Sequence, residues 1–220
     1  MHYDTIKNEH GLPHDPFKAI VAPRPIGWIG SSNKSGIHNL APYSYFNAIS
    51  DKPHYVVFSS SGYKDSIRNI EETKVFTASL ATEKLFDQMN NSSAPAKANV
   101  NEFDLAGLTP KIGKFVNAPY VAESPTALEC KLWKVIDLPG NDRSKGTGNY
   151  VVFGHVVGIF INDEYIKDGF FDANSARALG RLGYMNYGVV GKENIVSKNR
   201  PQLDENGNLK PIEEWDGKYR

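Results

Sequence analysis

Two strand-length runs, residues 127–138 and 150–161, dominate the second half of the chain and flank the loop PGNDRSKGTGN. Both runs contain many β-branched and aromatic residues, and glycine and proline punctuate the loop between them. Strands of this length need partners for their backbone N–H and C=O groups, so both belong in a sheet. The fold class then depends on what the other segments add to that sheet.

The remaining segments add strands and short helices without a regular alternation. Residues 24–31 and 37–50 predict a hairpin across the turn SNKSG, and 55–59 and 75–80 predict two further strands. We expect short helices at 66–73, after Thr82, near 100–106 and at 175–182, and a long surface connection at 107–125. Because the helices are inserted among strands, this order predicts a mainly β fold, an antiparallel barrel with peripheral helices.

Composition limits the size of the fold and the choice of partners. A chain of 220 residues, 40% of them hydrophobic, buries roughly 70% of the surface that its unfolded form exposes, which predicts one self-sufficient domain over 1–220. The 25 Lys and Arg balance the 25 Asp and Glu. No net field therefore attracts nucleic acid or an anionic membrane, and an anionic ligand has to be held by local geometry.

The use of cysteine indicates the compartment. Cys130 is the single cysteine, so no intrachain disulfide and no thiolate cluster can form. The N-terminus MHYDTIKNEH lacks the apolar core of a signal peptide, and the most apolar stretch, 151–161, is about half the length of the ~20 residues a membrane helix needs. We therefore expect a cytoplasmic protein.

The common catalytic and metal-binding motifs are not found. Gly146 and Gly148 resemble the start of a dinucleotide turn, but a strand follows them instead of a helix. His10 and His14 have the spacing of helical zinc ligands, but glycine and proline between them would break the helix. Cys130 lies in an alternating strand and is expected to be a core residue. We predict no catalytic side chain and no metal ligand.

The stretch SSSGYKDSIRNI, residues 59–70, has the composition of a phosphate site at a strand-to-helix junction. First-turn N–H groups and the helix dipole favour an anion, the serines Ser59, Ser60, Ser61 and Ser66 can donate, and Lys64 adds a positive charge. The alternative is that Asp65 or Ser66 only caps the helix and the serines fill a loop.

The segment HNLAPYSYFNAIS, residues 38–50, places polar groups in an expected core strand. Asn39, Pro42 and Ser44 alternate poorly with Tyr43 and Tyr45. Buried polar groups need partners, and the edge of a planar heteroaromatic ring would provide them. The alternative is a strand that crosses from core to surface.

The sequence resembles the flavin reductase-like, FMN-binding split-barrel family, which includes the flavoredoxins. The resemblance extends over about 16–187, taken as the domain core, and leaves a polar C-terminal extension at 192–220. The residues that carry it are Arg24-Pro-Ile-Gly-Trp-Ile29, Asn39-Leu-Ala-Pro-Tyr-Ser-Tyr-Phe46, Lys64-Asp-Ser66 with Asn69, Met89-Asn-Asn-Ser-Ser93, Asn101-Glu-Phe103, Ala106-Gly-Leu-Thr109, Glu123-Ser-Pro125, Leu128-Glu-Cys130 and Arg181-Leu-Gly183.

This resemblance implies a homodimer of split barrels, with FMN bound without a covalent link near the subunit interface. The cofactor-binding residues that it implies are Asn39, Leu40, Ala41, Pro42, Tyr43 and Ser44 for the ring, Ser59, Ser60, Ser61, Lys64, Asp65 and Ser66 for the phosphate and ribityl chain, and Lys97 and His155. The alternative for Lys97 is a solvated loop lysine, and the alternative for His155 is a hydrogen-bonded core histidine. Tyr184 departs from the family, where a glycine is frequent, and a tyrosine there can cover the ring.

The resemblance further implies an oxidoreductase in which NADH or NADPH transfers a hydride to the flavin, with no membrane or nucleic-acid partner. The alternative is a flavoredoxin-type carrier that keeps FMN and passes electrons between proteins without oxidising NAD(P)H itself.

Overall fold

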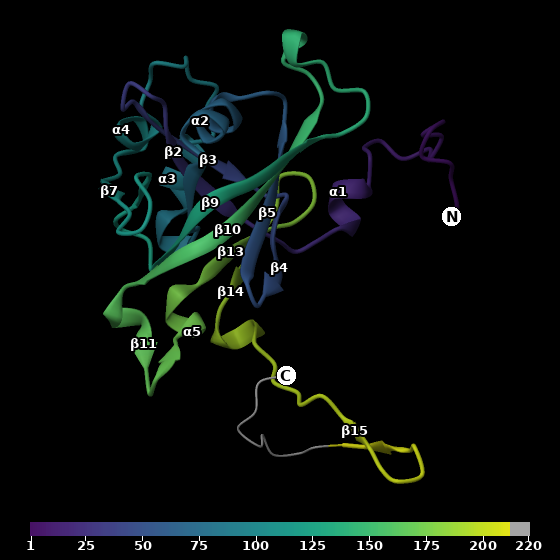
Figure 1. Ribbon diagram of the computed structural model, residues 1–220. Helices are drawn as coiled ribbons and strands as arrows, with labels where there is room; N and C mark the ends of the chain where they lie inside the picture. Colours follow the sequence, from purple (N-terminus) through teal and green to yellow (C-terminus); the bar gives the residue numbers. More distant parts are fainter. Residues whose placement is uncertain (212–220) are drawn as a thin grey trace.

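The computed structural model describes residues 1–211, and residues 212–220 of the expected C-terminal extension lie outside the described part. Its main feature is a seven-stranded antiparallel sheet in the order β3-β2-β6-β9-β10-β5-β4 (Figure 1). The strands of this sheet are β2 (Gly27–Ser32), β3 (His38–Tyr43), β4 (Phe46–Asp51), β5 (His54–Ser61), β6 (Val75–Leu80), β9 (Thr126–Asp137) and β10 (Asn149–Ile161).

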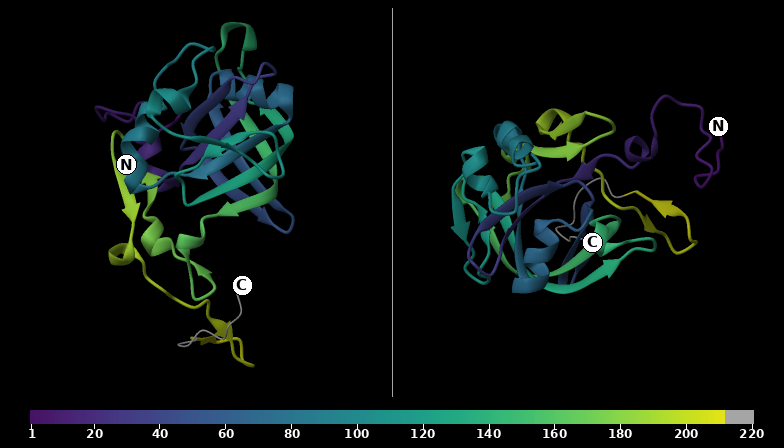
Figure 2. Two further views of the ribbon diagram at one scale, coloured as in Figure 1. Left: turned by 90° about the vertical axis from the view of Figure 1, so that its left-hand side faces the viewer. Right: turned by 90° about the horizontal axis from the view of Figure 1, so that it is seen from above.

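The sheet closes into a barrel because its two edge strands are consecutive in the chain. Only Ser44 and Tyr45 separate β3 from β4. Two linking residues span about 10 Å, whereas seven flat strands would hold the edges about 29 Å apart. The Ser59 N–H donates to the Tyr45 carbonyl (2.8 Å), so the β3–β4 turn lies against β5. The predicted antiparallel barrel with peripheral helices is confirmed, and the views in Figure 2 show the strands wrapped around its interior.

Two hydrophobic clusters stabilise the barrel, one on each side of β2. Alternate residues of this strand point to opposite faces, so Ile29 joins Phe58 and Phe76 inside the barrel. Trp28 joins Leu40 and a second group beneath α3 and α4. Each fully buried large side chain contributes about 1.5–3 kcal/mol relative to an exposed one. Cys130 is fully buried in the inner cluster, as its strand position predicts.

Short helices lie at the ends and sides of the barrel. Helix α2 (Asp65–Thr73) buries Ile67 and Ile70, whose spacing predicted it. The remaining helices of the described chain are α1 (Phe17–Ile20), α3 (Phe86–Asn91), α4 (Glu102–Ala106) and α5 (Ala173–Ala176), with 3-10 turns η1 (Glu83–Leu85), η2 (Arg143–Lys145), η3 (Asp163–Tyr165) and η4 (Lys192–Asn194). Figure 1 places α2 close to the ends of β2 and β3, with α3 and α4 beside those strands.

The prediction of one surface connection at 107–125 is wrong. The segment forms β7 (Pro110–Ile112) and β8 (Pro119–Val121), which pair with each other. Tyr120 and Val121 are buried, and the Val121 N–H donates to the Ser79 hydroxyl (3.1 Å) of β6. The backbone of β8 thus finds hydrogen-bond partners in β7 and in a side chain of β6, which local sequence does not indicate.

Two further expectations need correction. Residues 37–50 form two strands instead of one, β3 and β4, with the barrel's closing turn between them. The helix expected at 175–182 ends at Ala176, because Arg177 adopts a left-handed φ of 46°. The chain then enters β13 (Ala178–Arg181), which lies between β1 (Arg24–Pro25) and β14 (Tyr187–Val190). Backbone pairing with distant strands outweighs the local helical spacing.

The N-terminal segment and the described part of the C-terminal extension lead away from the barrel (Figure 2). The hairpin of β15 (Gln202–Leu203) and β16 (Leu209–Lys210) lies in the C-terminal extension, and β11 (Ile166–Lys167) pairs with β12 (Phe170–Phe171). Among the described residues, no helix has the length and apolar character needed to cross a membrane.

Candidate functional site

Two neighbouring cavities open beside β3. The first, here called the α2 cavity, has a volume of about 380 Å³, and its lining residues are Asn39, Ala41, Pro42, Tyr43, Lys64, Asp65, Ser66, Ser92, Ser93, Ala94, Pro95, Ala96 and Glu102. The second, here called the tyrosine cavity, has about 560 Å³ and shares Pro42 and Ser93 with the first. The shared residues make the two cavities parts of one site.

The N-terminus of α2 forms one wall of the α2 cavity. Lys64 precedes the helix in an extended conformation and makes no capping bond through its side chain. The first N–H groups of any helix have no partner within that helix, and its dipole favours an anion there. Across residues 1–211 no carboxylate oxygen lies within 4.0 Å of the Lys64 ammonium group. This wall therefore carries positive charge without a counter-ion.

The glycine before the helix packs against another loop of the protein. Gly62 has a φ of +90°, as the tight turn requires, but the backbone that approaches it belongs to the β9–β10 loop. Its N–H donates to the Gly148 carbonyl (2.7 Å), and the Tyr63 N–H donates to the Gly146 carbonyl (3.3 Å). The glycine thus allows two loops of the protein to pack together.

Arg143 of the same loop fastens it to α2. Its guanidinium donates to the carboxylates of Glu71 (2.8 Å) and Asp137 (2.6 Å) and lies over the rings of Tyr63 and Tyr150, at 4.7 and 5.3 Å from their centroids. These hydrogen bonds lower the pKa of the Asp137 carboxyl below its usual value. The loop is thereby tied to the strand-to-helix junction at several points.

A buried polar cluster lies beneath the first turn of α2. The Asn39 amide donates to the hydroxyls of Ser66 (2.9 Å) and Ser31 (3.2 Å). The hydroxyl of Tyr43 and the side-chain oxygen of Asn69 are buried there without a hydrogen bond. Burial raises the pKa of the Tyr43 hydroxyl, and the nearby side chains of Ser66 and Ser60 oppose that rise. Of Tyr43 and Asn69, Tyr43 is the one that lines the α2 cavity, so its hydroxyl is a candidate to bond a ligand there.

Two carboxyl groups also face the α2 cavity. Asp65 is neutralised by an ion pair with Arg68 on the next turn of the helix. Glu102 is buried and accepts a hydrogen bond from the Leu40 N–H (3.1 Å). Burial raises the pKa of Glu102, and this backbone hydrogen bond lowers it in part. Neither carboxylate lies within 4.0 Å of the Lys64 ammonium group.

The structure places the predicted residues 39–44 in three different surroundings. Asn39, Ala41, Pro42 and Tyr43 line the α2 cavity. The Leu40 side chain points into the core cluster beneath α4, so only its backbone N–H faces the site, through Glu102. Ser44 lines the tyrosine cavity.

The three predicted serines of β5 also separate, because a strand alternates its faces. Ser60 is buried and its hydroxyl donates to the Gly62 carbonyl (2.9 Å). Ser61 is exposed, and Ser59 lines an apolar groove on the other side of the β3–β4 turn. Of the expected phosphate-binding residues, Lys64, Asp65 and Ser66 come together and the serines at 59–61 do not join them in the lining.

Lys97 and His155 lie outside both cavities. Lys97 is exposed, directly after Ala94, Pro95 and Ala96, which do line the α2 cavity. The half-buried His155 stacks on Tyr55, with ring centroids 4.9 Å apart, on the outer face of the sheet.

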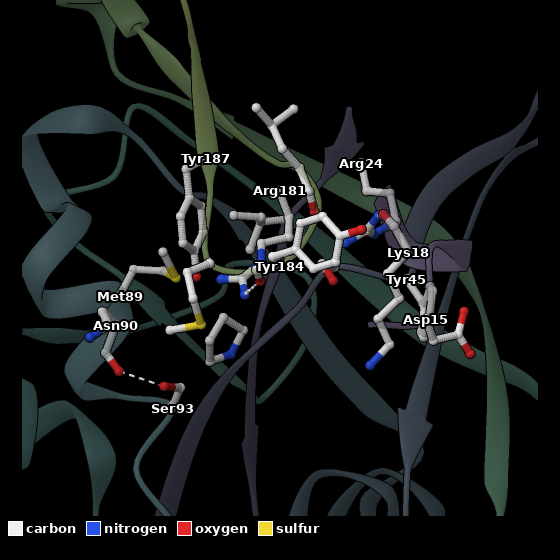
Figure 3. Close-up of a pocket in the computed structure, with 15 residues that line it drawn as sticks. Asp15, Lys18, Arg24, Tyr45, Met89, Asn90, Ser93, Arg181, Tyr184 and Tyr187 are labelled. Carbon is white, nitrogen blue, oxygen red and sulfur yellow. Dashed lines mark hydrogen bonds between the residues drawn. The ribbon is translucent and has the colours of Figure 1, made fainter. Parts of the chain in front are cut away.

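Several lining residues were not among the predicted site residues. Ser92 to Ala96 follow α3, and Glu102 begins α4, which Asn101 caps by accepting from the Phe103 N–H (3.1 Å). The sequence does contain this asparagine cap, which fixes where Glu102 begins its helix. The tyrosine cavity adds Lys18, Arg24, Tyr45, Arg181, Tyr184 and Tyr187, which Figure 3 shows around one opening.

The α2 cavity fits FMN by the chemistry of its lining. An uncompensated lysine, unpaired helix amides and the Ser66 hydroxyl suit a phosphate. The strip of Ala41, Pro42 and Tyr43 offers an apolar floor and backbone groups to a flat ring. An antiparallel barrel with such a cavity at a strand-to-helix junction fits the class of flavin-binding barrels.

Comparison with known proteins places the chain within that class. The family model of the flavin reductase-like domain matches residues 21–180. An uncharacterized protein of Aquifex aeolicus is 36% identical over 170 residues, which cover 74% of this chain and 83% of the relative. The chain therefore belongs to the flavin reductase-like family, and its barrel is the split barrel of that family.

Two solved structures are similar over most of their length. Nitrilotriacetate monooxygenase component B from Bacillus cereus has a TM-score of 0.80 at 26% identity and covers 89% of this chain and 98% of its own. The 2-nitrobenzoate 2-nitroreductase from Pseudomonas fluorescens has a TM-score of 0.79 at 26% identity, with 91% and 96% covered.

Proposed function

We propose that the α2 cavity binds FMN and that the protein is an oxidoreductase that uses NADH or NADPH to reduce it. The observation that carries the proposal is that Lys64, unpaired with any carboxylate of residues 1–211, lines one cavity together with Ser66 and the N-terminus of α2. Family membership supports the same ligand.

In this proposal the chain's own residues bind and orient. Lys64 and the first-turn amides of α2 hold the phosphate, and Asn39 keeps the Ser66 hydroxyl in place through its hydrogen bond. Ala41, Pro42 and Tyr43 would support the flat ring, and Ser44 lines the neighbouring tyrosine cavity. The flavin supplies the hydride chemistry when it is bound. No side chain is assigned a role as acid, base or nucleophile.

Titration of the purified apoprotein with FMN tests the first half of the proposal. Fluorescence quenching is expected to be saturable, and Lys64→Ala is expected to weaken binding by about 10 to 150-fold, the loss of one charge-assisted contact. Lys52→Ala is the matched control, because this exposed lysine lies at the opposite end of β5. A protein that does not quench FMN fluorescence at any concentration would overturn the proposal.

Anaerobic addition of NADH and of NADPH to the loaded protein tests the second half. At a saturating concentration of either nucleotide, the flavin absorbance is expected to bleach. A flavin that stays oxidised with both would instead favour the electron carrier, which keeps FMN and exchanges electrons with proteins. The cytoplasmic location expected from the sequence belongs to this proposal, since both nicotinamide nucleotides are plentiful there.

We further propose that two copies associate through the outer face of β5, β9 and β10. Trp133 is 62% exposed there and contacts the rings of Tyr55 and Phe153, at 5.8 and 5.6 Å between centroids. A second copy would cover this aromatic face and bring His155 toward the other subunit's flavin. Sedimentation of the wild type as a dimer, and of Trp133→Lys as a monomer, is expected. A monomeric wild type at micromolar concentration would exclude this arrangement.

A further inference from the structure

The tyrosine cavity carries a local excess of positive charge. Three cationic side chains, Lys18, Arg24 and Arg181, and one acidic side chain, Asp15, line it. Within residues 1–211 none of the three cations has a carboxylate oxygen within 4.0 Å. The chain as a whole has no net charge. The imbalance is therefore a property of this cavity and favours an anion inside it.

Arg24 is the most deeply placed of these cations. The residue is only 7% exposed, and its guanidinium donates to the carbonyl oxygens of Lys18, Val21 and Leu182. Carbonyl groups accept from its two terminal nitrogens but do not neutralise its charge, and its Nε–H is buried without a hydrogen-bond partner. A buried charge without a counter-ion is costly. An anionic ligand in the cavity would offset part of that cost.

Arg24 also fixes the other two cations relative to each other. Its bonds to Lys18 and Val21 reach α1 and its end, and its bond to Leu182 (3.0 Å) reaches the residue after Arg181. Lys18 and Arg181 thus stand on elements that one buried side chain holds together. Figure 3 shows Lys18 and Arg181 on different sides of the opening.

Aromatic rings line the space between the charges. Tyr45 lies near the Arg24 guanidinium (5.8 Å to the ring centroid), and Tyr187 lies against that of Arg181 (4.3 Å). Tyr184 is 52% exposed and stands between these groups in Figure 3. Rings arranged around cations offer stacking surfaces as well as charge, which suits a flat ligand with an anionic group.

We propose that the tyrosine cavity binds a small aromatic carboxylate, with its ring among Tyr45, Tyr184 and Tyr187 and its carboxylate toward Lys18 and Arg181. The proposal rests on the proposed function, because Pro42 and Ser93, shared with the α2 cavity, would place this ligand next to the flavin as a second substrate. The site assigns the chemical class of that substrate, which family membership alone does not.

Calorimetric titration of the full chain with benzoate and with benzamide tests the proposal, since the two differ in charge but hardly in shape. Saturable benzoate binding at least tenfold tighter than that of benzamide is expected. Lys18→Gln and Arg181→Gln are each expected to weaken benzoate binding by about 3 to 30-fold. Lys7→Gln, an exposed lysine of the same N-terminal segment, is the matched control and is expected to leave it unchanged.

Several results would overturn the proposal. They are equal affinities for benzoate and benzamide, no saturation with benzoate, or unchanged benzoate binding by Lys18→Gln. The Lys18 side chain is exposed, so this variant is expected to fold even if Arg181→Gln does not. A different result would assign the cations to a nucleotide phosphate instead. In that case the protein would not bind benzoate, and both variants would bind NADPH, but not NADH, more weakly than the wild type.

The same variants keep this proposal distinct from the proposed function. FMN affinity is expected to fall in Lys64→Ala and to stay unchanged in Lys18→Gln. Wild-type protein that binds benzoate but not FMN would overturn the proposed function and leave the carboxylate site standing. Protein that binds FMN, but shows neither saturable benzoate binding nor a preference for benzoate over benzamide, would overturn the carboxylate site and leave the proposed function standing.

Discussion

The side-chain amide of Asn39 donates a hydrogen bond to the hydroxyl of Ser66, 2.9 Å away, and so joins β3 to the first turn of α2. Both side chains are buried, at 6% and 1% exposed. The bond connects the strip that would support a flavin ring with the helix end that would hold its phosphate. This bond directly links the two halves of the proposed FMN site.

Replacement of Asn39 by alanine is expected to lower the free energy of unfolding by about 1–3 kcal/mol, since the buried hydroxyls of Ser66 and Ser31 lose their partner. FMN binding is expected to weaken as well, because Ser66 can rotate away from the phosphate. Urea denaturation and FMN titration measure the two effects. Asn47→Ala, at an exposed asparagine of β4, is the control, and equal stability of both variants would contradict the prediction.

Arg143 anchors the β9–β10 loop, which its glycine-rich sequence alone suggests to be mobile. Arg143→Lys keeps the charge but loses the fork that bonds Glu71 and Asp137 together. We expect a loss of about 1 kcal/mol in the free energy of unfolding and faster amide hydrogen exchange at Gly62 and Tyr63.

Arg177→Lys provides the control for Arg143→Lys. Arg177 also bonds two carboxylates, those of Glu83 and Glu193, but far along the chain from α2. For Arg177→Lys we expect a comparable loss in the free energy of unfolding but unchanged amide hydrogen exchange at Gly62. If Arg143→Lys also leaves this exchange unchanged, the backbone hydrogen bonds to Gly146 and Gly148 hold the loop without the arginine.

Glu102 is expected to make stability depend on pH. Burial raises the pKa of its carboxyl above the ordinary 4.5, and the Leu40 N–H opposes this. Between the ordinary and the raised value the folded chain keeps a proton that the unfolded chain has lost, so stability falls as pH rises through this window. Glu102→Gln keeps an oxygen for the Leu40 N–H and removes the titration.

Urea denaturation at several pH values above 4.5 measures the effect of Glu102. The decline of the free energy of unfolding with rising pH is expected to be shallower in Glu102→Gln than in the wild type. Glu72→Gln, at an exposed position of α2, should follow the wild-type curve. Parallel curves for all three proteins would show that Glu102 titrates alike in the folded and unfolded chains.

The sequence predicts the elements whose signals are local. The runs at β9 and β10, the strand β6 and the two isoleucines of α2 appear where alternation, turn residues and helical spacing place them. Residues 107–125 and 175–182 were misassigned because β8 and β13 depend on partners far away in the chain, such as Ser79 for Val121 and Ala81 for Leu179. Local pattern carries no information about those partners.

The candidate site follows the same division. Asn39 to Tyr43 and Lys64 to Ser66 are short contiguous segments whose composition marks them, and the fold brings them together. Glu102 enters through α4, and Arg24, Lys18 and Arg181 meet only because β1, α1 and β13 pack together. Gly62 adopts a positive φ, and the close neighbour it admits is the β9–β10 loop.

Tyr184 holds a backbone conformation that a tyrosine rarely adopts, with a φ of +55° in the turn closed by the Asn186 N–H and the Gly183 carbonyl (3.0 Å). A left-handed non-glycine residue costs about 1–2 kcal/mol, and glycine avoids this cost but loses about 0.4–1 kcal/mol through its freer unfolded chain. Tyr184→Gly is therefore expected to be as stable as the wild type or slightly more stable in urea denaturation. Benzoate binding is expected to weaken at least threefold, because the variant lacks a stacking ring, whereas Tyr184→Phe keeps the ring and should bind like the wild type. Tight benzoate binding by the glycine variant would remove Tyr184 from the carboxylate site and leave the strained backbone without a function.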